Sequence, residues 1–204
     1  MTHVTIVASP DAMPANLAKP PVAVGDFIWT DEAACAAMAA ELAQAMQPGL
    51  LAGESAYIEL HGTLGAGKTT FTRHLLRALG VQGRIKSPSY AVVEPHDAPG
   101  MAIHHFDFYR FNDPQEWEDA GFRDLFAAPG LKLAEWPEKA AGLLPRADLQ
   151  IHIQPPPQPD QGEQRTVRVE AFSPAGQQAL MALQAPGALS APPAAAPAGA
   201  QAHG

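Results

Sequence analysis

The sequence predicts an α/β domain in which helices flank a mixed β-sheet that is parallel at its centre. Strand and helix patterns alternate between residues 55 and 136, which is typical of parallel β-α-β units. Two strands that alternate apolar and polar residues then follow within residues 149–172, as the arms of a hairpin do. The chain has 204 residues, of which 47% are hydrophobic and 17% charged, and this composition is typical of a folded domain with its own core.

Composition divides the chain into three parts. Residues 1–26 are aperiodic and interrupted by prolines, and we expect them to form a flexible leader. Residues 27–184 carry the periodic patterns and are expected to form one domain. Residues 185–204 are rich in Ala, Pro and Gly and contain no Asp, Glu, Lys or Arg. We expect this tail to be disordered, because it can bury too little apolar surface to offset the entropy lost on ordering.

The charge and the cysteine content limit the classes of function. The formal net charge is −8, which opposes direct binding to nucleic acid. Cys35 is the single cysteine, so no internal disulfide can form, as is usual in a reducing compartment. The chain has neither a signal-peptide pattern at its start nor a run of about eighteen apolar residues. We therefore expect a soluble cytoplasmic protein, and any contact with RNA would need a local basic patch or a partner protein.

The elements of the first half lead into a glycine-rich loop. A helix is predicted over residues 31–46, capped by Thr30 or Asp31 and ended by Pro48 and Gly49. A strand over residues 55–60 runs into the loop, and a helix over residues 69–79 leaves it with one continuous apolar face.

The second half supplies the remaining strands of the sheet. Asp113 as cap and Pro114 at the first helical position predict the start of a helix. The other expected elements are strands over residues 90–95, 101–109, 131–136, 149–154 and 165–172, and a last helix over residues 173–184.

The loop after the first predicted strand has the pattern G-x-x-x-x-G-K-T. Glycines leave backbone N–H groups free to surround a triphosphate, and the start of the following helix directs further N–H groups at the same anion. A lysine then neutralises phosphate charge, and a hydroxyl next to it can bind Mg²⁺. The sequence therefore predicts a P-loop NTPase fold and a site for ATP and Mg²⁺. Its expected phosphate-binding residues are Gly62, Gly65, Ala66, Gly67, Lys68, Thr69 and Thr70.

A bound Mg²⁺ also needs an acidic side chain at the end of a neighbouring strand. Glu135 ends the apolar run LKLAE, and Asp107 ends MAIHHFD. A carboxylate at such a place can hold the metal or orient the attacking water. The segment KSPSY places two hydroxyls, Ser87 and Ser89, where a switch loop could sense the γ-phosphate.

Five segments in a fixed order resemble the TsaE family of bacterial ATPases, which are needed to form threonylcarbamoyladenosine in tRNA. The segments are GTLGAGKTTFTR, IKSPSYAVVEP, HHFDFYR, DPQEWEDAGFRDLF and LAEWPEKAAGLLP, and the resemblance covers residues 30–183. It implies that Thr69 and Glu135 hold Mg²⁺, that Lys68 acts on the phosphates and that Asp107 takes part in hydrolysis.

The resemblance also implies contacts around the rest of the nucleotide. Trp136 is expected near it, and Glu32, at the start of the first helix, is expected near the adenine. An arginine of the last hairpin is expected to approach the nucleotide as well. The candidates are Arg165 and Arg168, and the sequence leaves the choice between them open.

The implied function is a Mg²⁺-dependent ATP hydrolase, weak alone, that acts with the TsaD and TsaB proteins. These form threonylcarbamoyladenosine at adenosine 37 of tRNAs that read codons beginning with A. A small-molecule kinase is the alternative, although such kinases usually add an arginine-bearing lid and an acceptor pocket, and the arginines of this sequence are few and scattered. A GTPase would need an N-K-x-D segment, which is absent.

Overall fold

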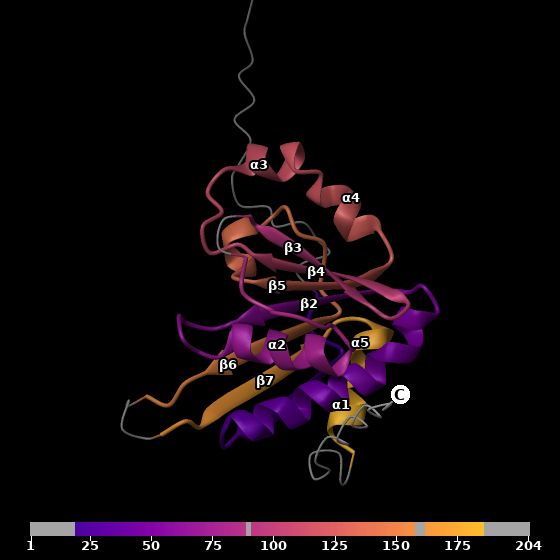
Figure 1. Cartoon of the computed structure of the whole chain (residues 1–204). Coiled ribbons are helices and arrows are strands. Elements are labelled where there is room, and N and C mark those ends of the chain that lie inside the picture. Colours follow the sequence, from indigo (N-terminus) through magenta and orange to yellow (C-terminus); the bar gives the residue numbers. More distant parts are fainter. Residues whose placement is uncertain (1–18, 89–90, 158–161, 186–204) are drawn as a thin grey trace, which may run out of the picture.

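The computed structural model describes residues 19–88, 91–157 and 162–185, which are drawn in colour in Figure 1. The strands are β1 (Ala23–Trp29), β2 (Ser55–His61), β3 (Val93–Ala98), β4 (Met101–Asp107), β5 (Gly130–Glu135), β6 (Leu149–Gln154) and β7 (Arg165–Ala171). The helices are α1 (Glu32–Leu51), α2 (Lys68–Ala78), α3 (Pro114–Asp119), α4 (Phe122–Ala127), α5 (Pro174–Leu183) and the short 3₁₀ helix η1 (Pro137–Ala140).

A seven-stranded sheet with the order β1-β7-β6-β2-β5-β4-β3 forms the centre of the structure. The inner strands β6, β2, β5 and β4 are parallel to one another, whereas the pairs β1–β7, β7–β6 and β4–β3 are antiparallel. This arrangement confirms the predicted α/β class with a mixed sheet that is parallel at its centre. The carboxyl ends of β2, β5 and β4 meet at one edge, where open α/β sheets bind their ligands.

Helices cover the two faces of the sheet unequally, as Figure 1 shows. On one face α1, α2 and α5 pack over the apolar residues of β2, β6 and β7 in the larger core. On the other face α3 and α4 cover the region of β4 and β5 with a smaller aromatic core around Phe106, Phe108 and Trp117. None of the described helices is both long and apolar enough to cross a membrane.

The first strand lies where the sequence predicts a leader. Residues 23–26 belong to β1, which pairs along its length with β7, so the leader boundary at residue 26 is wrong. Gly25 and Asp26 interrupt the apolar pattern of this strand, and its stability comes from a partner more than 130 residues away in the chain. Residues 1–18 and 186–204 lie outside the described part of the chain.

Three further elements differ from the prediction. Helix α1 continues through Pro48 to Leu51, because Leu50 is buried in the core and the backbone N–H groups of residues 52–54 close the last turn. Strand β3 begins at Val93 and tolerates Pro95 because it is an edge strand. The separate helix α4 was not predicted. The last helix and the two strands before it are confirmed.

Candidate nucleotide-binding site

The glycine loop joins the end of β2 to the start of α2. Gly62, Gly65 and Gly67 have φ angles of 146°, 78° and 114°, which favour glycine strongly over other residues. A Cβ atom on Gly62 would also lie 2.4 Å from the carbonyl oxygen of Ile153. Gly67 caps α2 without a side-chain hydrogen bond. The first N–H groups of the helix are therefore available to an anion, as the sequence predicts.

Lys68 folds back over this loop. Its Nζ donates hydrogen bonds to the carbonyl oxygens of Gly62, at 2.6 Å, and Thr63, at 2.9 Å. The same atom lies 3.8 Å from the centre of the Trp136 ring, close enough for a cation–π interaction. Burial lowers the pKa of Lys68, and the carboxylates of Glu135, Glu138 and Asp107 oppose this shift. The ammonium group is thus held at the loop by backbone oxygens, an aromatic face and nearby acids.

Trp136 adopts a backbone conformation that is rare for its residue type. Its φ of 57° is the one positive φ among the described residues other than glycine. Such a conformation costs about 1–2 kcal/mol for an L-residue and is concentrated at functional sites. The turn directs the indole over Lys68 and places it against the ring of Tyr109, with 4.9 Å between ring centres.

Glu135 ends β5 and connects the loop to the sheet. Its Oε2 accepts a hydrogen bond from the Thr69 hydroxyl at 2.9 Å, and its Oε1 accepts one from Nε2 of His105 at 2.9 Å. Both Glu135 and His105 are almost completely buried. A carboxylate and a hydroxyl are the hard oxygen ligands that Mg²⁺ prefers, so this pair fits the predicted metal site. Among the described residues no group of three or more His, Cys, Asp or Glu could hold a metal.

Asp107 ends the neighbouring strand and is the pairing partner of Glu135. Its Oδ1 accepts a hydrogen bond from the backbone N–H of Tyr109 at 3.0 Å, and its Oδ2 accepts one from the Ser87 hydroxyl. The predicted switch segment thus reaches Asp107 through Ser87, whereas Ser89 lies outside the described residues. A pocket of about 260 Å³ opens beside these groups, and Arg110 and Glu116 also line it.

A second pocket lies on the other side of the glycine loop. It has a volume of about 210 Å³. Arg165 donates from Nε to the carbonyl oxygen of Ala66 at 3.0 Å, and Glu32 accepts from Nε2 of His74 at 3.0 Å. Arg168 lies elsewhere and pairs with Asp26. The lining residues are Trp29, Asp31, Glu32, Cys35, Gly65, Ala66, Gly67, Thr70, Glu163 and Arg165.

The structure brings the predicted residues together in two adjoining groups. The first group surrounds the end of the loop and consists of Lys68, Thr69, Asp107, Glu135 and Trp136. The second group lines the second pocket and consists of Glu32, Thr70, Arg165 and the loop backbone.

The sequence did not predict the hydrogen bond of His105 to Glu135, because His105 is an ordinary residue of a predicted strand. The period of a strand was the available signal, because residues 105 and 107 of one strand point to the same face.

The glycine loop between a central strand and a helix, with this residue set around it, defines a P-loop NTPase fold. A family model for the threonylcarbamoyl adenosine biosynthesis protein TsaE matches residues 29–166. The chain therefore belongs to the TsaE family, whose members take part in the synthesis of threonylcarbamoyladenosine in tRNA.

Several relatives carry the name tRNA threonylcarbamoyladenosine biosynthesis protein TsaE. The protein of Haemophilus influenzae is 49% identical over 96 residues, which are 47% of this chain and 61% of that protein. The protein of Bacillus subtilis is 36% identical over 96 residues, which are 47% of this chain and 60% of that protein. The matches thus span about three fifths of these relatives. The crystal structure of YdiB from Bacillus subtilis has the same fold, with a TM-score of 0.61 and 22% identity over 79% of this chain and 95% of that chain.

Proposed function

We propose that this protein is a Mg²⁺-dependent ATP hydrolase. In this proposal it supports the formation of threonylcarbamoyladenosine at adenosine 37 of tRNAs that read codons beginning with A, and it acts with the TsaD and TsaB proteins in the cytoplasm. The observation that carries the proposal is the hydrogen bond between Thr69, on the glycine loop, and Glu135, at the end of β5. It joins the two expected metal ligands in a chain of the TsaE family.

The proposed role of the loop is to hold the triphosphate. Backbone N–H groups from Gly65 to Thr69 surround the phosphates, and Lys68 exchanges its bonds to carbonyl oxygens for bonds to phosphate oxygens. Thr69 and Glu135 hold Mg²⁺, which neutralises phosphate charge when bound.

Asp107 is the proposed catalytic carboxylate. It lies beside Glu135 at the same edge of the sheet and belongs to the lining of an open pocket. A carboxylate there can orient the attacking water and receive its proton. The Ser87 hydroxyl donates a hydrogen bond to one of its oxygens, so the switch segment contacts the proposed catalytic group directly.

The second pocket is the proposed place of the nucleoside. Glu32 and Arg165 are polar groups in its lining, and Trp29 adds an aromatic side chain. The arginine of the last hairpin is then Arg165, because Arg168 is engaged by Asp26 and Glu170.

Contact with tRNA is proposed to pass through the partner proteins. The net charge of −8 opposes direct binding to a polyanion. P-loop proteins couple hydrolysis to their partners through segments that sense the γ-phosphate, and Ser87 is placed for such a function.

The test is the release of inorganic phosphate from Mg²⁺-ATP by the purified protein, measured with and without TsaD and TsaB. We expect slow release alone, faster release with the partners, and none above background for Lys68→Ala in either case. Release by Lys68→Ala at the wild-type rate would contradict the proposed site.

A small-molecule kinase is the second candidate, and the pocket beside Asp107 is the observation that favours it. In the same assay with γ-labelled ATP, a kinase would transfer the label to an added organic acceptor. A hydrolase releases the label as inorganic phosphate.

A further inference from the structure

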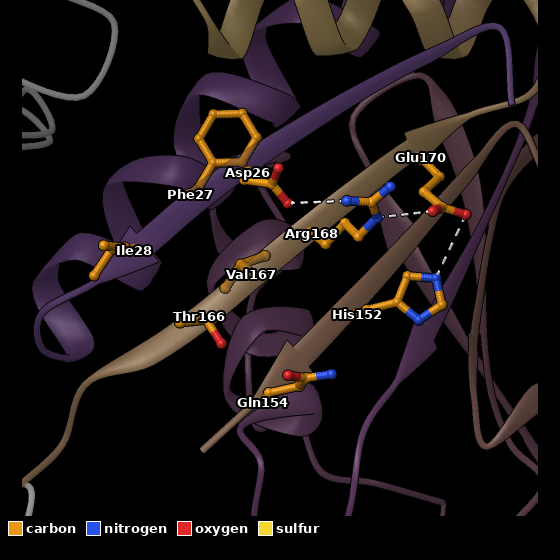
Figure 2. Close-up of a pocket in the computed structure, with 9 residues that line it drawn as sticks. All are labelled: Asp26, Phe27, Ile28, His152, Gln154, Thr166, Val167, Arg168 and Glu170. Atoms are coloured by element: carbon orange, nitrogen blue, oxygen red, sulfur yellow. Dashed lines mark hydrogen bonds and ion pairs between the residues drawn. The ribbon is translucent and has the colours of Figure 1, made fainter. Parts of the chain in front are cut away.

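An open region of the sheet lies on the face opposite α1, α2 and α5. Its pocket has a volume of about 560 Å³, and the described residues that line it belong to β1, β6 and β7 (Figure 2). We call this region the open face; its side chains are Asp26, Ile28, His152, Gln154, Thr166, Arg168 and Glu170, whereas Phe27 and Val167, which also line the pocket, pack in the larger core. The other end of the same face is covered by the aromatic core beneath α3 and α4.

The charged side chains of the open face form a row of contacts across three strands. Arg168 lies between two acids, with its Nη1 3.4 Å from Oδ1 of Asp26 and its Nε 2.9 Å from Oε1 of Glu170. The other oxygen of Glu170 is 3.9 Å from Nε2 of His152. Figure 2 shows this chain of contacts running from β1 through β7 to β6.

The row continues to the segments that build the nucleotide site. The His152 ring stacks on His61, with 4.5 Å between ring centres and 15° between planes. His61 directly precedes Gly62 of the glycine loop, and its Nδ1 lies 3.9 Å from Oε2 of Glu138 in η1. Glu138 follows Trp136, which covers Lys68. The open face is therefore connected to the glycine loop through the direct contacts of His152, His61 and Glu138.

Charge and exposed apolar area indicate the kind of partner. Asp26 and Glu170 outnumber Arg168 on the open face. His152 adds no positive charge at neutral pH, because burial and the neighbouring His61 lower its pKa. Beside this acidic row, Ile28 and Val24 of β1 are 57% and 37% exposed. The acids favour a basic partner and oppose a nucleic acid, and the aliphatic side chains favour a protein with an apolar contact area.

We propose that the open face is the docking surface for a partner protein that presents Lys or Arg side chains beside an apolar patch. Binding there acts on the nucleotide site through the stacked pair His152 and His61. This inference rests on the proposed function, because the TsaD–TsaB pair is the partner that the proposed function supplies.

The test measures the affinity of the purified protein for immobilised TsaD–TsaB in the presence of Mg²⁺-ATP. The variant Ile28→Asp/Asp26→Lys changes two exposed side chains of the open face. Its matched control, Met181→Asp/Asp119→Lys, makes the same changes on α5 and α3, where Met181 is 63% exposed. We expect the open-face variant to bind at least about tenfold more weakly and the control to bind within about twofold of wild type. ATP affinity should stay unchanged in both, and the open-face variant should melt at a somewhat lower temperature, because Asp26→Lys replaces the ion pair with Arg168 by two like charges.

The outcomes separate this proposal from the proposed function. If wild type binds TsaD–TsaB and the open-face variant binds equally well, the docking surface is wrong and the proposed function stands. If wild type does not bind TsaD–TsaB, the partner assignment and the docking surface fail together. Binding of tRNA to the isolated protein that is reduced by the open-face variant alone would assign this face to RNA and overturn the proposal.

Discussion

Thr69 and Glu135 are joined by a hydrogen bond of 2.9 Å between the threonine hydroxyl and one carboxylate oxygen. The two residues lie 66 positions apart in the chain, one in the first turn of α2 and the other at the end of β5. His105 holds the second carboxylate oxygen at the same distance. The orientation of the carboxylate is therefore set from both sides, as is usual for a preorganised metal site.

Glu135→Gln should weaken the binding of Mg²⁺-ATP about tenfold or more. The amide keeps the size of the side chain but is a poorer ligand for a hard cation than a carboxylate. Titration calorimetry with ATP in Mg²⁺ and in EDTA separates the metal-dependent part of the affinity. Glu118→Gln, on the exposed surface of α3, is the control and should bind like wild type. An unchanged Mg²⁺ dependence in Glu135→Gln would remove Glu135 from the metal site.

Lys68→Ala should abolish measurable ATP binding while the protein stays folded. The variant loses the charge at the phosphates and leaves the Gly62 and Thr63 carbonyl oxygens without their donor, which should cost about 1–2 kcal/mol of stability. Calorimetry measures the binding, and circular dichroism during heating measures the stability. Lys139→Ala changes an exposed lysine of η1 and should behave like wild type. Near wild-type ATP affinity in Lys68→Ala would show that the lysine does not contact the phosphates.

His105→Phe should raise the Mg²⁺ concentration needed for half-maximal ATP binding by about tenfold, because Glu135 loses the donor that fixes its Oε1. His105→Gln can still donate a hydrogen bond and should recover part of this loss. A role in packing alone would change the melting temperature of both variants without changing the Mg²⁺ requirement, and that result would refute the orienting role.

Ionisation of Cys35 should destabilise the protein at high pH. Burial, with a smaller contribution from Glu32, raises the pKa of this thiol from an ordinary value of 9.0 to about 12. The unfolded chain therefore loses the thiol proton at lower pH than the folded chain, and the free energy of unfolding falls as the pH rises from 9 to 12. Below pH 9 the thiol is protonated in both the folded and the unfolded chain, so its ionisation takes nothing from the free energy of unfolding.

The measurement for this prediction is urea unfolding under reducing conditions at several pH values. Wild type should lose more stability than Cys35→Ala between pH 8 and about pH 11. Parallel pH profiles for the two proteins would mean that the thiol ionises equally easily in the folded and unfolded chains.

Local patterns predicted the glycine loop and the ends of its flanking elements correctly, because the chemistry of phosphate binding limits the residues at each loop position. The pairing of Glu135 with Asp107 was also within reach, since both residues end apolar runs of parallel strands. The choice between Arg165 and Arg168 could not be predicted, because strand residues three positions apart face opposite sides of the sheet and only the position of β7 in the sheet decides which of them meets Ala66.

Long-range packing explains the remaining differences. β1 lacks a clear strand pattern around Gly25 and Asp26. Its hydrogen bonds to β7 join residues far apart in the chain, so no local pattern can predict them. The burial of Leu50 extends α1 past Pro48, although proline normally ends a helix. His105 reaches Glu135 only because β4 lies next to β5 in the sheet. The sequence of either strand by itself does not show that the two strands are neighbours.

The most direct test of the central claim is the amount of threonylcarbamoyladenosine in tRNA after depletion of this protein in its own bacterium. Digested tRNA is analysed by mass spectrometry after complementation with wild type, Lys68→Ala or Lys139→Ala. The account predicts a loss of the modified nucleoside that wild type and Lys139→Ala restore and Lys68→Ala does not. An unchanged level after verified depletion, or full restoration by Lys68→Ala, would contradict it.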